Sequence, residues 1–328
     1  MIIFVIILWF CFVKALIINQ IYKISLNVLI TGGAGFIGRY LAERLLGNNQ
    51  ITIYDDLSNS DIEKISFLIS RGVRFIKGDV LDFEKLLESS KNFDVIIHLA
   101  AKSDVAESVI FPEETIDVNV NGTINVLKCC AQNKIRKIIF ASSASVYGDS
   151  SDIITEKSVT NPLSPYGKSK LDAETQIRKF AKEFGFCAVI LRLFNVYGKG
   201  QNDQYAGVIS KFLKNISENK SLIIYGDGKQ TRDFVSVYDV IRSFECAISS
   251  EYNDTYNIAS GKSVSVNELV EMMLKISGKD MEIIYRKEKA GEIKCSQCNI
   301  SLAQKLGFSP KIDLEKGLKD LVSHTNFL

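Results

Sequence analysis

Short apolar runs alternate with amphipathic stretches along most of this chain, from about residue 26 onward. The runs are rich in Val and Ile, as expected of strands covered on both faces, and the stretches between them indicate helices. Functional residues are then expected at the carboxyl ends of the strands. The alternation predicts a doubly wound parallel sheet of the α/β class, with strands at 27–30, 51–54, 73–76, 95–99, 137–141 and 187–191.

The pattern loosens after these runs, which indicates a second and smaller part of the chain. Short strands are predicted at 222–225 and 256–259, and an amphipathic helix over 265–276. Ser265 followed three residues later by Glu268 is typical of a capping box at the start of that helix.

Composition places the chain among ordinary globular proteins of enzyme size. Its 328 residues are 46% hydrophobic, and 40 Lys and Arg against 38 Asp and Glu give a net charge of +2. This balance argues against a nucleic-acid partner. Seven cysteines, an odd number, are typical of reduced thiols in the cytoplasm. Cys295 and Cys298 have a metal-like spacing but no second pair, so we predict no metal site.

The N-terminus differs from the rest of the chain. Residues 1–13 are all apolar, and Lys14 follows them. The uninterrupted run is short for a bilayer, although residues 1–18 could span one with the Lys14 side chain extended to the membrane surface, and the flanks of a secretory signal are missing. Two interpretations of residues 1–25 remain. The favoured one is a misplaced start, and the other is a marginal anchor on the cytoplasmic face of a membrane.

A glycine turn joins the first predicted strand to the helix that follows it. Gly32, Gly35 and Gly38 permit a tight turn, the close approach of a phosphate and close packing of the helix. The free amides at the start of the helix would then face a pyrophosphate. This placement predicts a Rossmann-type dinucleotide site.

The second predicted strand ends in a carboxylate. Asp55 lies 17 residues beyond Gly38, close to the separation expected for the acid that binds the adenine ribose. A carboxylate there repels a 2′-phosphate, and no Arg occurs in 55–60, so NAD is expected rather than NADP. The alternative for Asp55 is a simple turn at the end of the strand.

The third and fourth strands end in small or polar residues. Asp79 and Val80 follow the third strand and would line the adenine side of a dinucleotide. Leu99 to Ala101 follow the fourth and would line the pyrophosphate and nicotinamide side. His98 lies inside an apolar strand, so we expect a core histidine bonded to the backbone.

Three further residues have the chemistry of a proton-transfer site. Tyr166 and Lys170 lie four residues apart, on one face of a predicted helix, and Ser143 follows the strand 137–141. A neighbouring ammonium and a positive nicotinamide ring would lower the pKa of the phenol, so that Tyr166 acts as a base near neutrality. Ser143 would share the substrate oxygen.

In combination these features resemble the extended short-chain dehydrogenase/reductase family, in its nucleotide-sugar epimerase and dehydratase branch, over about residues 26–323. That resemblance implies NAD as cofactor, a nucleotide-sugar substrate and a homodimer. It also implies a Rossmann domain over 26–195, joined by part of 233–262, with 196–328 mainly a substrate lobe. The motifs that carry it are the glycine turn 32–38, then 55–60, 142–148, 164–170, 192–195 and 231–234.

The resemblance also implies roles for single residues. Phe194 would lie near the nicotinamide, and Asn195 would contact the sugar diphosphate. Arg232 would pair with a phosphate, which its planar fork suits, unless it forms a surface salt bridge instead. Lys289 stands where relatives often carry a phosphate-binding Arg. The expected cofactor set is Gly32, Gly35, Phe36, Ile37, Gly38, Asp55, Asn59, Ser60, Asp79, Val80, Leu99, Ala100, Ala101, Tyr166, Lys170 and Phe194. The expected substrate set is Ser143, Tyr166, Asn195, Arg232, Lys289 and Ser296.

The residues after Ser143 bear on the reaction. Dehydratases of this branch typically carry an Asp-Glu pair there, whereas this chain has Ala144 and Ser145. We therefore expect 4-epimerisation of a UDP-hexose through a 4-keto intermediate, with dehydratase or decarboxylase chemistry as the alternative. A non-catalytic dinucleotide-binding protein is the remote alternative. Ser296 stands where galactose epimerases often have a bulky tyrosine, so N-acetylhexosamines would fit as well.

Overall fold

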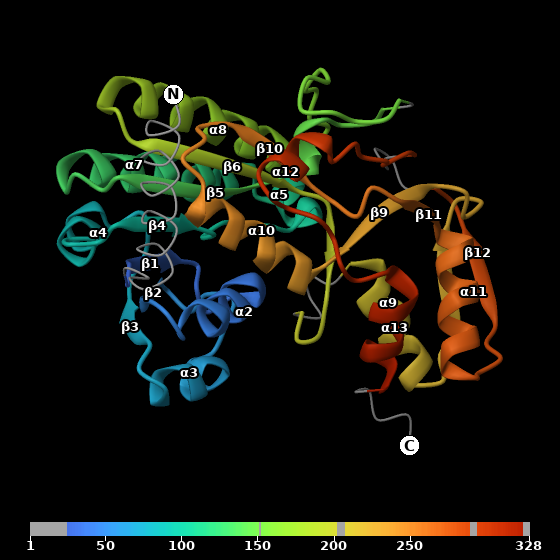
Figure 1. The fold of residues 1–328 in the computed structure, drawn as a ribbon. Coiled ribbons are helices and arrows are strands. Elements are labelled where there is room, and N and C mark those ends of the chain that lie inside the picture. Colours follow the sequence, from blue (N-terminus) through green and yellow to red (C-terminus); the bar gives the residue numbers. More distant parts are fainter. Residues whose placement is uncertain (1–24, 151, 202–206, 289–293, 324–328) are drawn as a thin grey trace, which may run out of the picture.

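The computed structural model describes residues 25–150, 152–201, 207–288 and 294–323. Its main feature is a seven-stranded sheet in the order β10-β6-β5-β4-β1-β2-β3, in which all neighbouring strands are parallel (Figure 1). The doubly wound fold expected from the sequence is thus confirmed. The strands are β1 (Asn27–Thr31), β2 (Gln50–Asp55), β3 (Arg74–Lys77), β4 (Val95–His98), β5 (Lys137–Ser143), β6 (Cys187–Leu193) and β10 (Thr255–Ile258).

Helices cover both faces of this sheet, because successive side chains of each strand point to opposite faces. Val28 and Ile30 of β1 face one core, whereas Leu29 between them faces the other. The first core is closed by α2 (Phe36–Leu45), α3 (Ser66–Ser70), α10 (Val237–Ser249) and α12 (Ser301–Lys305). The second is closed by α4 (Phe83–Ser89), α7 (Gly122–Gln132) and α8 (Pro165–Phe184).

A smaller group of elements lies beside the sheet and has a core of its own. Strands β11, β9 and β7 form one sheet, and β12 pairs with β8. Its strands are β7 (Asn195–Tyr197), β8 (Leu222–Tyr225), β9 (Thr231–Ser236), β11 (Ser263–Ser265) and β12 (Ile283–Arg286), and its helices are α9 (Val208–Ser217), α11 (Val266–Ser277) and α13 (Leu314–Ser323).

Two local predictions from the sequence are confirmed in this smaller group. Strand β8 has the predicted bounds, and the side chains of Ser265 and Glu268 form the predicted capping box at the start of α11. Short helices complete the described chain: α5 (Val105–Ile110), α6 (Pro112–Ile116), η2 (Asp117–Asn121) and η3 (Ala144–Val146) contact α8, whereas η1 (Ile62–Ile65) contacts α3.

No helix in the described part of the chain is both long and apolar enough to cross a membrane. Residues 1–18, which carry the interpretation as an anchor, lie outside the described residues.

Candidate active site

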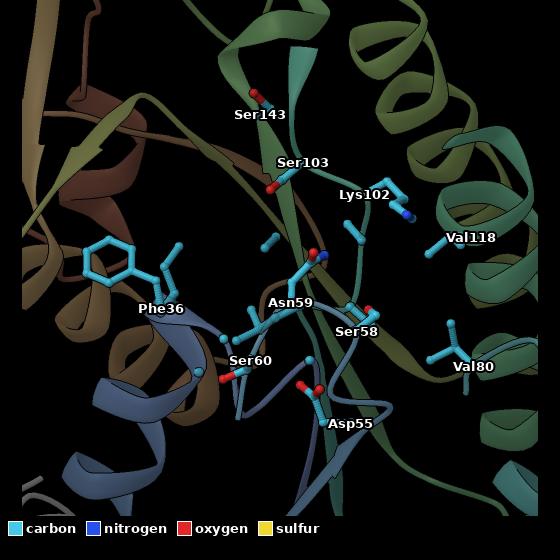
Figure 2. A pocket seen from close by; sticks show the side chains of 18 of the residues that line it. Phe36, Asp55, Ser58, Asn59, Ser60, Val80, Lys102, Ser103, Val118 and Ser143 are labelled. Carbon is cyan, nitrogen blue, oxygen red and sulfur yellow. The ribbon is translucent and has the colours of Figure 1, made fainter. Parts of the chain in front are cut away.

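A cavity of about 460 Å³ opens at the carboxyl ends of the parallel strands. In Figure 2, Asp55 and Ser60 lie at one end of the view, Ser143 at the other, and Lys102 and Val118 to one side. The position agrees with the rule that open α/β sheets bind ligands beyond their strand ends. Every residue predicted for the cofactor lines this cavity: Gly32, Gly35, Phe36, Ile37, Gly38, Asp55, Asn59, Ser60, Asp79, Val80, Leu99, Ala100, Ala101, Tyr166, Lys170 and Phe194.

The glycine turn brings backbone against backbone beneath the cavity. Gly32 has a φ of +69°, and a Cβ there would lie 2.5 Å from the amide nitrogen of Ala100. A Cβ on Gly38 would lie 2.6 Å from the Cα of Gly33. Helix α2 begins directly after Gly35, which has no side chain to cap the first amides. These amides are thereby left for a ligand at the start of the helix.

Asp55 is fixed by the backbone around it. Its carboxylate accepts from the amides of Ala34 at 3.0 Å and Leu57 at 2.8 Å. Ser60 donates to the carbonyl oxygen of Ala34 at 2.7 Å, which ties the loop after β2 to the glycine turn. Burial raises the pKa of Asp55, while the hydrogen bonds donated by the two backbone amides lower it. The geometry thus presents an acceptor to the cavity.

Tyr166, Lys170 and Ser143 meet at the other end of the cavity. Tyr166 and Lys170 lie in the first two turns of α8, and Ser143 is the last residue of β5. The Ser143 hydroxyl lies near the Tyr166 phenol and lowers its pKa. The Lys170 Nζ atom donates to the carbonyl oxygen of Ala141 at 2.9 Å and lies 6.0 Å from the centre of the Tyr166 ring. The three residues selected from the sequence are therefore brought together.

The acid-base character of this trio differs from the expectation. Burial raises the pKa of Tyr166, and only the nearby Ser143 hydroxyl lowers it. Burial also lowers the pKa of Lys170 to about 7, against an opposing effect of the Glu174 carboxylate. From the sequence, a neighbouring ammonium was expected to lower the pKa of the phenol. In the folded chain the charge of this ammonium is itself weakened by burial.

A second cavity of about 90 Å³ adjoins the first. Its walls include the predicted substrate residues Ser143, Asn195, Arg232 and Ser296. The side chain of Asn195 donates to the Asp233 carbonyl oxygen at 3.0 Å, which fixes its orientation. The two cavities share Ser143, Ser145, Leu193 and Phe194. The remaining predicted substrate residue, Lys289, lies outside the described residues.

A model of the NAD dependent epimerase/dehydratase family matches residues 28–259 of the chain. The chain belongs to this family. A putative UDP-glucose 4-epimerase of Methanocaldococcus jannaschii is 40% identical over 303 residues, which cover 90% of this chain and 97% of that protein. The relationship extends well beyond the motifs that suggested it.

Solved structures of the family agree with the computed one along most of its length. A UDP-N-acetylglucosamine 4-epimerase from Methanobrevibacter ruminantium M1, in complex with UDP-N-acetylmuramic acid, superimposes with a TM-score of 0.88 at 35% identity, covering 91% of this chain and 97% of that one. A UDP-glucose 4-epimerase with UDP-glucose from Thermotoga maritima gives a TM-score of 0.87 at 32% identity, with coverages of 91% and 98%.

As a member of this family the chain is an enzyme, and its cofactor is NAD. The cavity fits that cofactor. The open amides of α2 suit its pyrophosphate, and the fixed carboxylate of Asp55 suits the hydroxyl groups of its ribose. A Cβ added at Gly35 would lie 3.2 Å from the Gly32 carbonyl oxygen, a tight approach that favours glycine at the start of α2.

The sequence argument missed several residues that line these cavities. Lys102 and Ser103 line the larger one from the loop after β4, and Cys295 lines the smaller one. Lys102 also forms ion pairs with Glu107 at 3.6 Å and Glu114 at 3.3 Å. Its place directly after the fourth strand was a usable signal, because strand ends meet at one edge of the sheet. Cys295 gave no comparable signal.

His98 is a core residue as predicted, but its partners are not backbone atoms. Its ring lies between the hydroxyls of Thr31, at 2.6 Å from Nδ1, and Thr123, at 2.9 Å from Nε2. Thr123 donates its proton to the carbonyl oxygen of Asn119 at 2.6 Å, so it must accept from Nε2–H. Thr31 then donates to Nδ1. Burial lowers the pKa of His98 to about 3, which keeps the ring neutral.

Proposed function

We propose that this enzyme catalyses the NAD-dependent 4-epimerisation of a UDP-hexose, converting UDP-glucose and UDP-galactose and accepting their N-acetylhexosamine counterparts. One observation carries the proposal. Ser143 lines both the cofactor cavity and the smaller cavity, and Tyr166 and Lys170 line the cofactor cavity, so a sugar that reaches from the smaller cavity past Ser143 would meet all three. The family and its 4-epimerase relatives support this assignment.

The roles follow from the geometry of the trio. Tyr166 would accept the proton of the 4-hydroxyl, and the Ser143 hydroxyl, which lines both cavities, would donate to the same oxygen. NAD, held by the glycine turn and Asp55, would supply the hydride acceptor for C4 and the hydride donor for its reduction. The charge of Lys170 favours the ionised phenol. The resulting 4-keto sugar must turn within the pocket, so that Tyr166 returns its proton after C4 has been reduced on the opposite face.

Substrate binding then rests mainly on the nucleotide diphosphate. Arg232 and Asn195 line the smaller cavity and have the donors that a diphosphate requires. A sugar held through its diphosphate can rotate, whereas tight contacts to its ring would prevent the turnover of the keto intermediate. This division of binding suits epimerisation.

The tolerance for N-acetyl groups is inferred from small side chains. Ser296 and Cys295 line the smaller cavity from the segment that follows residue 293, and neither is bulky. An N-acetyl group on the sugar requires room at such a wall. The relative solved with UDP-N-acetylmuramic acid is consistent with a pocket of this kind.

Dehydratase chemistry is the alternative, since the family includes both reactions. Elimination of water needs an acid and a base beside the sugar. Ala144 and Ser145 stand at the positions that would supply them, and neither side chain titrates in the required range. Epimerisation needs no such pair, which is why we favour it.

The test is to incubate the purified chain and NAD with UDP-glucose and, separately, with UDP-N-acetylglucosamine, and to separate the products by chromatography. We expect the C4 epimer from both substrates. A 4-keto-6-deoxy product in place of an epimer would overturn the proposal. Tyr166→Phe removes the proton acceptor while keeping the ring, so turnover should fall by roughly 10²–10⁴-fold with NAD still bound.

A further inference from the structure

A buried ionic cluster lies where the catalytic helix α8 packs against strands β5 and β6. The Glu174 side chain is fully buried, and its two oxygens accept from Arg192 Nε at 2.8 Å and Nη2 at 2.6 Å. Arg178 Nη2 lies 2.8 Å from the same carboxylate, and Ser142 donates to it at 2.6 Å. The cluster thus joins α8 to β5 and β6, next to the reacting groups.

The cluster contacts the catalytic trio through adjacent residues. Ser142 precedes Ser143 in β5, and Glu174 lies one helical turn after Lys170, on the same face of α8. The carboxylate therefore fixes the backbone that carries Ser143. It also lies close enough to act on the charge of Lys170.

The buried ammonium of Lys170 requires a nearby negative charge to stay protonated. Its Nζ atom is bonded to a neutral carbonyl oxygen and lies 4.8 Å from the centre of the Phe140 ring, in a site where its side chain is almost fully buried. Burial disfavours an ammonium unless a negative charge compensates. The titratable groups around it are Tyr166 and Glu174 on α8, the neutral His98 on β4 and, beyond Glu174, Arg178 and Arg192.

Glu174 is the negative group among these. Burial lowers the pKa of Lys170, and the field of Glu174 opposes this effect, so that the pKa lies at about 7 with Glu174 in place. Arg192 and Arg178 hold Glu174 ionised, since their hydrogen bonds and charges lower the pKa of its carboxyl despite burial. The same cations also screen Glu174 from Lys170.

We propose, resting on the proposed function, that Glu174 is a positioning residue for catalysis: its carboxylate keeps Lys170 charged, and Arg178 limits the strength of that effect. Glu174 need not touch NAD or sugar for this role. Arg178 is suited to a limiting role because 47% of its side chain is exposed, so its charge can be removed without opening the core.

The two substitutions are expected to act in opposite directions. Glu174→Gln removes the charge that supports the ammonium, so Lys170 should lose its proton at lower pH, and the alkaline limb of the kcat profile should move down by about one pH unit. Arg178→Gln leaves Glu174 less neutralised, so the same limb should move up. Lys179→Met, an exposed position on the same helix, is the control and should leave the limb unchanged.

A second measurement does not depend on turnover. The full-length, NAD-bound enzyme is treated with trace acetic anhydride over a range of pH, and acetylation of Lys170 is quantified by mass spectrometry. Only the neutral amine reacts, so the midpoint of labelling reports the pKa of Lys170. We expect this midpoint to fall in Glu174→Gln and to rise in Arg178→Gln.

The outcomes separate this inference from the proposed function. Shifted labelling midpoints without any epimer product would refute the substrate and support the role of Glu174. Epimer formation with unchanged labelling midpoints and an unchanged alkaline limb in both variants would refute the role of Glu174. The proposed function would then still stand. If Glu174→Gln does not fold, Arg178→Gln still decides, since an unchanged or lowered midpoint in that variant contradicts the inference.

Discussion

At the scale of single residues, the glycine turn tolerates the least change. A Cβ on Gly38 would collide with the Cα and carbonyl oxygen of Gly33, which are backbone atoms that cannot rotate away. We expect Gly38→Ala to destabilise the fold by roughly 1–3 kcal/mol and to weaken NAD binding, because α2 must move away from the turn. Thermal unfolding and NAD titration by fluorescence measure the two effects.

Gly47 provides the matched control for this prediction. It lies just after α2, and a Cβ there would have no neighbour within 4 Å. Gly47→Ala should therefore leave both stability and NAD affinity close to those of the unaltered chain. Equal losses in the two variants would mean that the contact with Gly33 is not the cause.

The sequence could predict those site residues that stand at a fixed position before or after a recognisable strand or helix. Gly38, Asp55 and Tyr166 were found because each stands at a fixed place relative to a strand or helix. The partnership of Glu174 with Arg192 was not found, since the two residues lie on different elements and meet only in the folded molecule. The weakened charge of Lys170 was missed for the same reason, because burial is a property of the fold.

At the scale of elements, two strands extend further than their apolar runs. Strands β5 and β6 were predicted to end at 141 and 191, but they continue to Ser143 and Leu193. The added residues Ser142 and Arg192 are polar, which resembles the start of a loop. In the structure they pair with each other across the two strands, and Glu174 satisfies both side chains. Tertiary contacts thus overrode the local pattern.

Helix α10 ends against a lysine from the central sheet. The Lys137 Nζ atom donates to the carbonyl oxygens of Ala247 at 3.2 Å and Ile248 at 2.8 Å, and it also contacts that of Ser250. Lysine at a helix C-terminus satisfies carbonyl groups that have no partner within the helix and interacts favourably with its dipole. Lys137 therefore joins α10 to β5.

Replacement of this lysine is expected to weaken that junction. Lys137→Met keeps the length of the side chain but removes the donors, and it should lower the free energy of unfolding by about 1–2 kcal/mol. Chemical denaturation measures this loss. The exposed Lys179→Met serves as the comparison, and an equally large effect there would contradict a specific role for Lys137.

At the scale of the whole molecule, the helices α5 and α6 expose apolar side chains. Val109 is 64% exposed, Ile110 68% and Phe111 52%, and the three are consecutive in the chain. Large apolar groups gathered in this way are typical of an interface. We expect them to join two copies of the chain into the homodimer that the family resemblance implies.

A charge at the centre of this surface should separate the copies. We expect Ile110→Asp to shift the enzyme from dimer to monomer in sedimentation velocity, because the carboxylate would be buried without a partner. Val159→Asp is the control, since Val159 is 85% exposed at a distant point of the sequence and should leave the mass unchanged. A monomeric enzyme before substitution would refute this expectation.

The order of elements was the part of the whole molecule that could be predicted from the sequence. The alternation of runs implied the parallel sheet, and β10 joins that sheet beside β6 from a distant part of the chain. We propose that 26–195, together with part of 233–262, forms the NAD-binding domain, and that 196–328 mainly forms the substrate lobe. Periodicity alone did not show how the strands and helices after residue 195 pack around the smaller cavity.

The hydrogen-bonded position of His98 leaves the described part of this enzyme without the side chain that proteins most often use to respond to mild acid. Imidazole ordinarily changes charge between pH 5 and 8, but His98, the one histidine among the described residues, stays neutral across that interval. Proton transfer at the described site is therefore left to a phenol and an amine. Among the groups of the described site, slight acidification would act on Lys170, and not on His98.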